Sequence, residues 1–425
     1  MDGRQVDNGQ HIMLGAYTES LRLMKLAGVD LHAAMLSLPL QMRYPPGAGG
    51  MDFLAPRLPA PLHLLGALLR ATGLAREDKL SLARFSTTAR WMDWQLNHDC
   101  SVDELLQRFD QTPRLVQLMW RPLCLAALNT PTDRASAQVF LNVLRDSLGA
   151  RRKASDMLIP RADLSALFPE GAAAYVARHG GTVHSGAKVT ALAQLPGGRW
   201  QLSATGAALP PRAGLADEGA AATPWSAAFD AVILAQGAPA AAALLRTLPG
   251  SAGGAGNALA AQLETFSPEA ITSCYLQYHA GVRLDIPFYA LLDNPAAGHW
   301  GQFVFDRGQL DPAQAGMLAV VISASGKAAE LEQAVLGAAI AAQLAAVLRR
   351  PELAQPSWSR VVTEKRATYA CSPALARPAN ATGLPGLLLA GDYTAADDPA
   401  ATYPATLESA VRSGVAAVKT LLKSK

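Results

Sequence analysis

The sequence predicts an α/β protein in which strand-rich and helix-rich segments interleave along the chain. Three observations favour this fold class. Residues 62–149 have mainly helical periodicity, residues 271–323 hold a set of short strands, and residues 386–422 combine an apolar strand with a final helix. Because 425 residues are too many for one ordinary core, two or more domains are expected.

The start of the chain is predicted to be a strand end over residues 3–6, followed by a polar turn, Asp7-Asn8-Gly9-Gln10-His11. Helical periodicity then covers residues 14–27 and stops at Gly28. In the helical stretch that follows, Ser101, Thr112 and Ser136 each precede an apolar periodic run, and Pro113 suits a first turn. These three residues are therefore predicted to begin helices.

After Pro160 the pattern changes to short strands separated by turns and helices. A helix is expected over residues 172–179 and another over 328–349. Strands are expected at 182–184, 187–193, 200–204, 229–235, 271–279, 287–292, 302–305, 318–323, 357–364 and 386–390. Loops rich in Ala, Gly and Pro are expected at 208–224 and 251–257.

The composition excludes several classes of protein. Half of the residues are hydrophobic and only 17% are charged, so a disordered chain is excluded and a large core or apolar cavity is indicated. Trp91, Trp94 and Trp120 either fill that core or line an apolar ligand tunnel. The net charge of +3 and the absence of long basic runs argue against a nucleic-acid partner. The four cysteines are far apart and no HExxH occurs, so neither a disulfide framework nor a metal site is expected.

The start of the chain has no signal-peptide pattern, so a cytoplasmic protein is expected. One segment leaves peripheral membrane contact open. Residues 58–75 are apolar with few charges, and they form either a core helix or a segment that dips into a membrane surface. The sequence indicates no particular oligomeric state.

The most informative segment for chemistry lies near the C-terminus. Leu387-Leu388-Leu389-Ala390 predicts a buried parallel strand, and Gly391 would let the backbone approach a ligand closely. Asp392 at the end of this strand can accept a hydrogen bond from a sugar or ribityl hydroxyl. Pro404 suits the first turn of the next helix, whose free N–H groups can face an anion or a carbonyl. A plain strand packed on a helix would show the same pattern.

The full wording of this segment, LAGDYT followed by YPATLESAVRSG, resembles the C-terminal flavin motif of the amine oxidase and phytoene desaturase superfamily. The resemblance implies FAD as the cofactor, bound by Gly391 and Asp392 and by the run Tyr403-Pro404-Ala405-Thr406. The turn VDNGQH is similar to the segment beside the flavin and adds Gly9 and Gln10. Residues 181–192 are similar to the adenine-side strands, where Val189 would contact adenine through its backbone.

One branch of the superfamily has more similar sequence motifs. RPLCLAALNT (121–130), ASAQVF (135–140) and IPRADLSALFP (159–169) are similar to the squalene-associated FAD enzymes, the hydroxysqualene dehydroxylases of bacterial hopanoid synthesis. This resemblance implies reductive dehydroxylation of hydroxysqualene to squalene, with a long apolar isoprenoid as substrate. In that chemistry an acid protonates the leaving hydroxyl, and reduced flavin supplies hydride inside a water-excluding pocket. His11, with Asp7, is the candidate proton donor, although a histidine closing a polar turn would look the same.

Three alternatives stand beside this hypothesis. The chain could be a carotenoid desaturase or a flavin amine oxidase of the same superfamily, although amine substrates favour an aromatic cage or paired carboxylates, which the sequence does not mark. It could also be a lipid- or partner-binding protein without FAD. That reading follows from a departure: the family begins with a strand, a GxGxxG turn and a helix, which this sequence lacks. A near match, Gly254-Ala255-Gly256, is expected in a loop. About 40 residues are therefore expected to be missing at the start by comparison with the family.

The expected architecture is an interleaved, Rossmann-like FAD-binding domain, shortened at its N-terminus, with a helical cap and a mostly antiparallel substrate-domain sheet. The FAD-binding segments are expected at residues 1–35, 156–245 and 366–425. The cap or substrate segments are expected at 36–155 and 246–365. A second departure is the ten residues between Asp392 and Tyr403, where the family's spacing is shorter.

Overall fold

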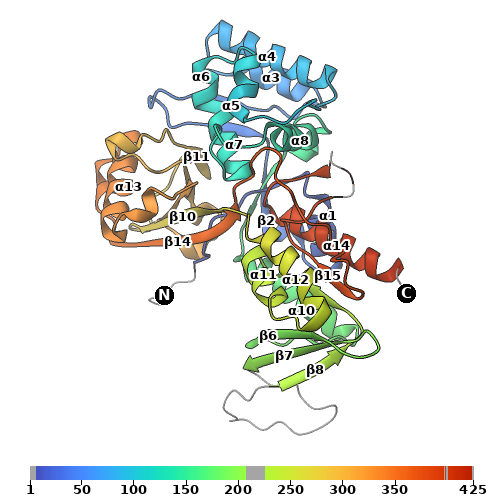
Figure 1. The fold of residues 1–425 in the computed structure, drawn as a ribbon. Helices are drawn as coiled ribbons and strands as arrows, with labels where there is room; N and C mark the ends of the chain where they lie inside the picture. Colours follow the sequence, from blue (N-terminus) through green and yellow to red (C-terminus); the bar gives the residue numbers. More distant parts are fainter. Residues whose placement is uncertain (1–5, 207–224, 397, 399–400, 424–425) are drawn as a thin grey trace. The chain divides into compact units, whose positions relative to one another are not determined.

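The computed structural model describes residues 6–206, 225–396, 398 and 401–423 (Figure 1). Two compact units make up the chain, and each is assembled from two separate stretches. Unit 1 comprises Met1–Pro169 and Pro268–Leu375, and unit 2 comprises Glu170–Ser267 and Ala376–Lys425. The interleaved α/β fold expected from the sequence is confirmed. The finer division into five segments stays a prediction.

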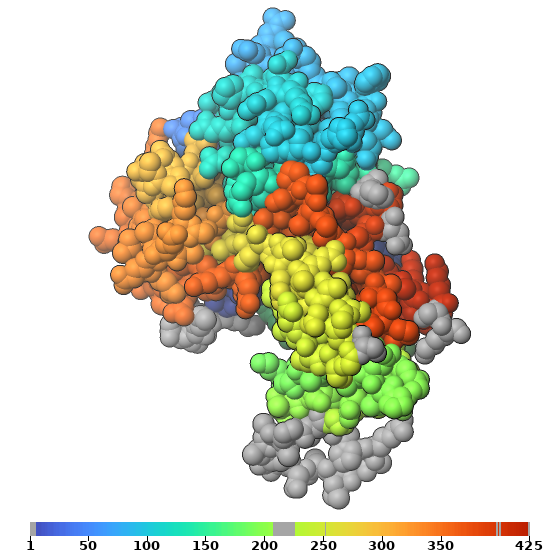
Figure 2. All heavy atoms as spheres, in the orientation of Figure 1, coloured from blue at the N-terminus to red at the C-terminus, as the bar shows by residue number. Residues whose placement is uncertain are grey.

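The first stretch of unit 1 is mainly helical. Its residues that are coloured blue to cyan in Figure 2 form part of the surface of unit 1. Its helices are α1 (Thr18–Leu26), α2 (Leu31–Ala34), α3 (Leu62–Arg70), α4 (Arg76–Trp91), α5 (Val102–Arg108), α6 (Pro113–Leu115), the π-helix η1 (Val116–Trp120), α7 (Arg121–Leu128), α8 (Ala137–Ser147), the 3-10 turn η2 (Arg152–Ser155) and α9 (Leu164–Leu167). The three predicted caps are confirmed: the hydroxyls of Ser101, Thr112 and Ser136 accept the backbone N–H groups three residues ahead.

The tryptophans of this stretch have different environments. Trp120 is buried and packs on Phe85, with ring centroids 4.6 Å apart, while its indole N–H donates to Gln111 Oε1 at 2.9 Å. Trp94 is also buried. Trp91 is 87% exposed, so neither predicted role applies to it. Core filling is therefore the role of two of the three side chains.

Two small antiparallel sheets accompany the helices of unit 1. Strand β5 (Met157–Pro160) lies between β1 (Met13–Leu14) and β2 (Met35–Leu38). A hairpin is formed by β3 (Gln41–Arg43) and β4 (Asp52–Leu54). Residues 3–5 of the predicted first strand lie outside the described residues, and Val6 is not in a strand.

The second stretch of unit 1 is a five-stranded antiparallel sheet covered by one long helix. The strand order is β11 (Phe288–Ala290), β12 (Phe303–Asp306), β13 (Met317–Ser323), β10 (Pro268–Gln277) and β14 (Trp358–Tyr369). Helix α13 (Gln333–Val347) buries Leu336, Ile340 and Leu344 against one face of this sheet (Figure 1). The short 3-10 turns η3 to η7 (Pro295–Ala297, Arg307–Gln309, Pro312–Gln314, Ala328–Glu330 and Pro351–Ala354) connect these elements. The predicted antiparallel sheet is confirmed.

The described residues of unit 2 form an antiparallel sheet, a parallel strand pair and four helices. The sheet has the order β6 (Ala187–Gln194), β7 (Trp200–Gly206) and β8 (Trp225–Phe229). Strands β9 (Val232–Leu234) and β15 (Leu387–Leu389) pair in parallel, as the buried apolar run predicted. The helices are α10 (Pro169–Arg178), α11 (Ala238–Leu245), α12 (Gly250–Leu263) and α14 (Leu407–Lys423).

Three predictions for unit 2 are wrong. Residues 182–184 are irregular and pair with no described strand. Residues 251–257, including Gly254-Ala255-Gly256, belong to α12 and not to a loop. The glycines serve close packing there, because a Cβ on Gly256 would lie 2.7 Å from the Leu245 carbonyl oxygen of α11. The last helix begins at Leu407 and not at Pro404. The loop expected at 208–224 lies outside the described residues.

Candidate flavin site

In unit 1, the predicted turn at residues 7–11 is held by side chains from distant parts of the sequence. The Tyr275 hydroxyl donates to the Asp7 carbonyl oxygen at 2.9 Å, and Asp7 Oδ1 accepts the backbone N–H of Leu164 at 3.1 Å. Arg307 Nη1 donates to Gln10 Oε1 at 2.6 Å. Tyr275 and Arg307 are both buried. The turn is therefore fixed in place, and the Asp7 carboxylate is engaged as a cap of α9.

His11 folds back over Gly9 in this turn. A Cβ on Gly9 would lie 3.6 Å from His11 Nε2 and 4.0 Å from Ser273 Oγ. Burial lowers the pKa of His11, and the nearby Asp7 carboxylate opposes this only in part. Because the neutral imidazole is favoured, His11 can exchange hydrogen bonds but is a weak source of protons near neutral pH.

The sheet face opposite α13 brings an aromatic surface to this turn. In antiparallel sheets directly paired residues share a face. One row across the strands therefore contains Phe288, Phe305, Ala319 and Tyr275, and the rings of Phe288 and Phe305 stack with centroids 5.5 Å apart. The next row contains Phe303, Val321 and Ser273.

Ser273 is the polar exception on this face. Its side chain is fully buried, and its hydroxyl has no hydrogen-bond partner among the described residues. A buried hydroxyl without a partner costs roughly 1–3 kcal/mol, so its presence needs an explanation. Ser273 lies beside Gly9 and His11, where its hydroxyl could form a hydrogen bond with a polar group of a ligand.

In unit 2, the loop after β15 is organised by Ser413 of α14. The Ser413 hydroxyl accepts the Gly391 N–H at 3.0 Å and contacts Thr394 Oγ1 at 2.6 Å. Asn380 donates to Ser413 Oγ at 2.9 Å and to the Leu389 carbonyl oxygen at 2.8 Å. The end of the strand, the loop and the helix are thereby joined by one buried polar network.

Gly391 allows a close approach within the protein itself, and its predicted contact with a ligand stays a prediction. A Cβ at this position would lie 2.3 Å from Cε1 of Tyr393, so the close approach is made by the ring two residues ahead. Tyr393 is fully buried with its ring edge-on to Phe266, at a centroid separation of 6.2 Å. Its hydroxyl has no hydrogen-bond partner among the described residues. This is a second buried polar atom that a ligand could satisfy.

Asp392, in the loop after β15, is partly buried. Burial raises the pKa of its carboxyl group, while the charge of Arg377 and backbone N–H donors act in the opposite direction. Arg377 also donates to the Tyr403 carbonyl oxygen at 2.7 Å, and the guanidinium of Arg412 lies 4.9 Å from the centre of the Tyr403 ring. A carboxyl group of this kind would gain from a hydroxyl donor supplied by a ligand.

Thr406, predicted to touch the cofactor, is the N-cap of α14. Its hydroxyl accepts the Ser409 N–H at 3.2 Å, and the Ser409 hydroxyl donates to the Asp392 carbonyl oxygen at 3.3 Å. Pro404 and Ala405 precede the helix and take no part in its first turn, which corrects the prediction for Pro404. The helix begins after Thr406 because the threonine hydroxyl accepts a free N–H group of the first turn, which Pro404 has no side-chain group to accept.

Val189 belongs to a different part of unit 2. It lies on β6, where it pairs with Ala204 of β7 just before an irregularity in the register. Its proposed contact with adenine stays a prediction.

Sequence reasoning missed the residues that hold both clusters. Tyr275, Arg307 and Asn380 belong to none of the motifs found in the sequence, and the partners of these residues lie up to 297 positions away. Ser413 lies inside the motif YPATLESAVRSG, next to Gly414, so the sequence marks its neighbourhood. Its hydrogen bond to Gly391 could not be predicted from the motif. The others could be found only from the fold.

Comparison with known proteins places the chain in a family. Residues 1–422 match the family described as flavin containing amine oxidoreductase. The chain belongs to this family. The flavin expected from the sequence is therefore its cofactor, and the unpartnered hydroxyls of Ser273 and Tyr393 are the features of this structure that fit a bound polar group.

One curated relative is informative about the branch. Over 311 residues the chain is 30% identical to a hydroxysqualene dehydroxylase of Sinorhizobium fredii (strain NBRC 101917 / NGR234). The match covers 71% of this chain and 61% of the relative, so the chain spans less than two thirds of that protein's length.

Solved structures share the fold at low sequence identity. Cyclohexylamine oxidase from Brevibacterium oxydans IH-35A is 15% identical with a TM-score of 0.60, covering 98% of this chain and 88% of that one. An oxidoreductase from Methanosarcina mazei is 13% identical with a TM-score of 0.65, covering 96% and 87%. Within the described residues, no cluster of three potential metal ligands occurs, and no helix combines the length and apolarity needed to cross a bilayer.

Proposed function

We propose that the chain acts in FAD-dependent reductive dehydroxylation, converting hydroxysqualene to squalene. The observation that carries this proposal is the 30% identity to a hydroxysqualene dehydroxylase over 311 residues. The amine-oxidising structures with the same fold are only 13–15% identical, which supports the fold and not their substrates. The wording at 121–130 and 159–169 supports the same branch.

The sheet face in unit 1 suits an apolar substrate. Phe288, Phe303 and Phe305 are buried on it, and no acidic pair accompanies them in the two rows described. An amine substrate would need a compensating carboxylate or a cage of rings. Apolar side chains around the reacting carbon would instead exclude water that could capture a developing cation.

The reaction balances with one reductant. When bound, reduced FAD supplies the two electrons and the hydrogen that replaces the hydroxyl. The carbon–oxygen bond would break, the hydroxyl would leave as water with the second hydrogen of reduced FAD as its proton, passed directly or through solvent, and a carbon–hydrogen bond would form. The free Ser273 hydroxyl would donate to the leaving oxygen, and neutral His11 would orient that hydrogen bond.

The remaining predicted residues would hold the cofactor. Asp392 would accept a hydrogen bond from a ribityl or ribose hydroxyl. The Tyr393 hydroxyl would form a hydrogen bond with a polar atom of the same ligand. Gly9, Gln10 and Val189 would approach it mainly through the backbone. The loop Tyr403-Pro404-Ala405-Thr406 would place the start of α14 toward an electron-rich group.

Anaerobic turnover tests the proposal. The full chain, loaded with FAD and reduced chemically, is incubated with hydroxysqualene, and squalene is measured by gas chromatography and mass spectrometry. In deuterated water one deuterium should appear at the former carbinol carbon. Ser273→Ala should slow the reaction about tenfold or more, whereas Ser359→Ala, an exposed serine on the same sheet, should not.

Other products would overturn the assignment. Desaturation of a carotenoid precursor, or oxidation of an amine by oxidised FAD, would move the chain to a neighbouring branch. Squalene formed without deuterium would contradict a solvent-exchanged flavin hydrogen as the source.

A further inference from the structure

Helix α3 points its leucines outward. The side chains of Leu62, Leu65 and Leu69 are 50%, 51% and 68% exposed, and they share one side of the helix at spacings of three and four residues. The opposite side buries His63, Ala67 and Leu68. A surface helix of a globular protein normally has the reverse arrangement. The outward side of α3 is therefore an unpartnered apolar strip.

The preceding loop extends this strip. A Cβ on Gly66 would lie 2.8 Å from Pro56 Cγ and 3.6 Å from Leu58 Cδ1, so the glycine lets the loop pack directly on the helix. Leu58 is itself 42% exposed. Leu58, Leu62, Leu65 and Leu69 together are called the α3 surface below.

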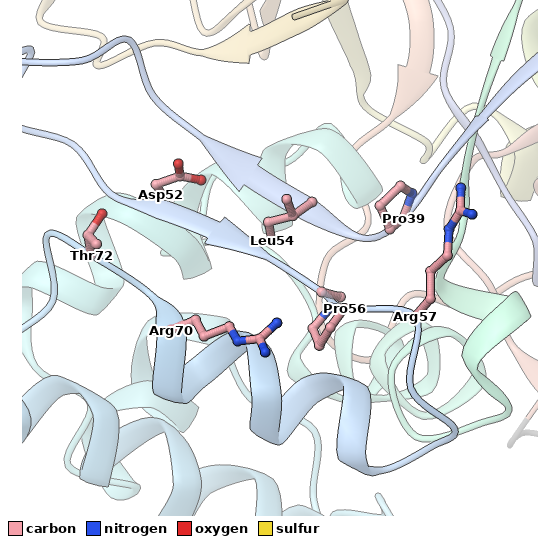
Figure 3. Close-up of a pocket in the computed structure, with 8 residues that line it drawn as sticks. Pro39, Asp52, Leu54, Pro56, Arg57, Arg70 and Thr72 are labelled. Atoms are coloured by element: carbon pink, nitrogen blue, oxygen red, sulfur yellow. The ribbon is translucent and has the colours of Figure 1, made fainter.

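Basic side chains border the α3 surface. Arg57 and Arg70 are exposed, and neither makes a hydrogen bond or ion pair with a described residue. Both line a pocket of about 370 Å³ together with Pro39, Asp52, Leu54, Ala55, Pro56 and Thr72 (Figure 3). Among the described residues that line this pocket, Asp52 alone has a carboxylate, and it is paired with Arg43 at 2.7 Å. The two guanidinium groups are therefore left to attract an anion.

The positive charge of the chain is concentrated in this region. Residues 55–92 contain six Lys and Arg against two Asp and Glu, a net charge of +4, whereas the whole chain has +3. One of the two acids, Asp78, is buried as a cap that accepts the Ala75 N–H at 2.7 Å. The exposed charge beside the α3 surface is thus almost entirely basic.

Helix α4 adds a second outward stripe of the same kind. Leu80 and Trp91 are 54% and 87% exposed, and their spacing of eleven residues places them on one side of the helix, with Arg84 between them. An exposed tryptophan beside arginine is typical of segments that lie at the boundary of lipid headgroups and acyl chains.

We infer that the α3 surface docks on a bilayer that carries anionic lipids. The leucines would enter the headgroup boundary, and Arg57 and Arg70 would contact lipid phosphates from the adjoining pocket. A protein partner could also cover leucines, but the excess of unpaired positive charge at the rim favours an anionic surface. The inference rests on this surface alone and does not depend on the proposed reaction.

Vesicle co-sedimentation of the full chain tests the inference. Binding to vesicles of phosphatidylcholine with phosphatidylglycerol is expected, with much weaker binding to phosphatidylcholine alone and with release at high salt. Leu65→Ser with Leu69→Ser should weaken binding at least tenfold. Arg57→Gln with Arg70→Gln should weaken binding about thirtyfold to the anionic vesicles and little to the neutral ones.

Matched controls separate docking from folding. Leu26→Ser with Val335→Ser replaces two aliphatic side chains of similar exposure, 50% and 53%, elsewhere in unit 1. This double change should leave binding unchanged. Circular dichroism and thermal melting show that each variant is folded. The proposal is overturned if the wild type does not bind, if the controls weaken binding equally, or if inorganic phosphate alone at millimolar concentration abolishes it. Concentration-dependent dimers that the leucine changes abolish, without vesicle binding, would assign the surface to a second copy instead.

Discussion

The two candidate flavin-binding clusters, one in each unit, are supported in opposite ways. The turn at residues 7–11 is held by partners from far along the chain, with Arg307 lying 297 positions from Gln10. The loop at 391–394 is held by Asn380 and Ser413, within 33 positions of each other. The loop cluster is therefore a local unit of strand, loop and helix. The turn depends on the complete sheet of unit 1.

This difference predicts where substitutions will act. A local network transmits damage to the stability of its own unit, since the buried carbonyl groups lose their donors. A turn held by distant partners can loosen while the sheet that carries those partners stays intact. The three predictions that follow test this contrast, beginning with the largest effect.

Asn380→Ala should destabilise the protein by about 3 kcal/mol. Its side chain is buried and donates to Leu389 and to Ser413, and each unsatisfied buried partner costs roughly 1–3 kcal/mol. Urea unfolding measures this change. Asn257→Ala, at an exposed position of α12 in the same unit, is the matched control and should change stability by less than about 0.5 kcal/mol. Equal effects of the two changes would contradict a network role for Asn380.

Tyr275→Phe should cost only about 1 kcal/mol and act on the turn. It removes the hydroxyl that donates to the Asp7 carbonyl oxygen, while the ring stays in the sheet. Hydrogen exchange of the residue 7–11 amides should accelerate about fivefold, and that of β10 should not change. As a comparison, Tyr278→Phe removes a donor to Leu353 on the other face and should leave the turn protected. Uniform acceleration over the whole sheet would argue against a separately anchored turn.

The smallest expected effects are on pH dependence, and they have opposite signs in the two clusters. The raised pKa of Asp392 means that its contribution to stability is complete below the ordinary value of 3.8 and is lost as pH rises through the raised value. The lowered pKa of His11 means that its contribution is complete above the ordinary value of 6.5 and is lost as pH falls through the lowered value. Asp392→Asn and His11→Asn should each flatten one of these changes in the flavin-free protein.

Denaturant midpoints measured from pH 3 to pH 8 check both signs. Asp133→Asn and His98→Asn, which change exposed side chains, should leave the profile unaltered. If Asp392→Asn instead lowered stability at neutral pH without flavin, its carboxylate would be a stabilising partner and not a group held for a ligand. In the flavin-bound protein the same change should weaken flavin affinity, because a hydrogen bond to a charged group contributes about 1.5–3 kcal/mol.

The contrast also explains what the sequence could predict. Caps such as Ser101 and Ser136, and the apolar run of β15, depend on neighbouring residues, so local patterns were sufficient. The stretch 251–257 was predicted wrongly because glycine and alanine suit both a loop and a closely packed helix, and only contact with Leu245 decides between them. The start of α14 was misplaced because Thr406 competes with Pro404 for the same end of the helix.

The site followed the same division. The sequence motifs identified Asp392 and the turn at Asp7, but they did not predict which side chains surround these residues. The unpartnered hydroxyls of Ser273 and Tyr393 result from burial by residues remote in sequence, and no motif marks either position. The outward leucines of α3 could be suspected from composition, although the side of the helix that faces solvent is fixed by what His63 and Ala67 pack against.

The interleaving of the two units has a consequence for synthesis on the ribosome. Strand β10 follows the whole of residues 170–267, and its neighbours β13 and β14 follow later still. Strand β9 must wait for β15, more than 150 positions downstream, before its parallel pairing can form. Unit 1 cannot close before residues 268–375 are made, and unit 2 cannot close before the last fifty residues are made, so the apolar strand β9 stays unpaired until late in synthesis. Nascent chains of this protein should therefore depend on chaperones for longer than a protein of the same size built from consecutive domains.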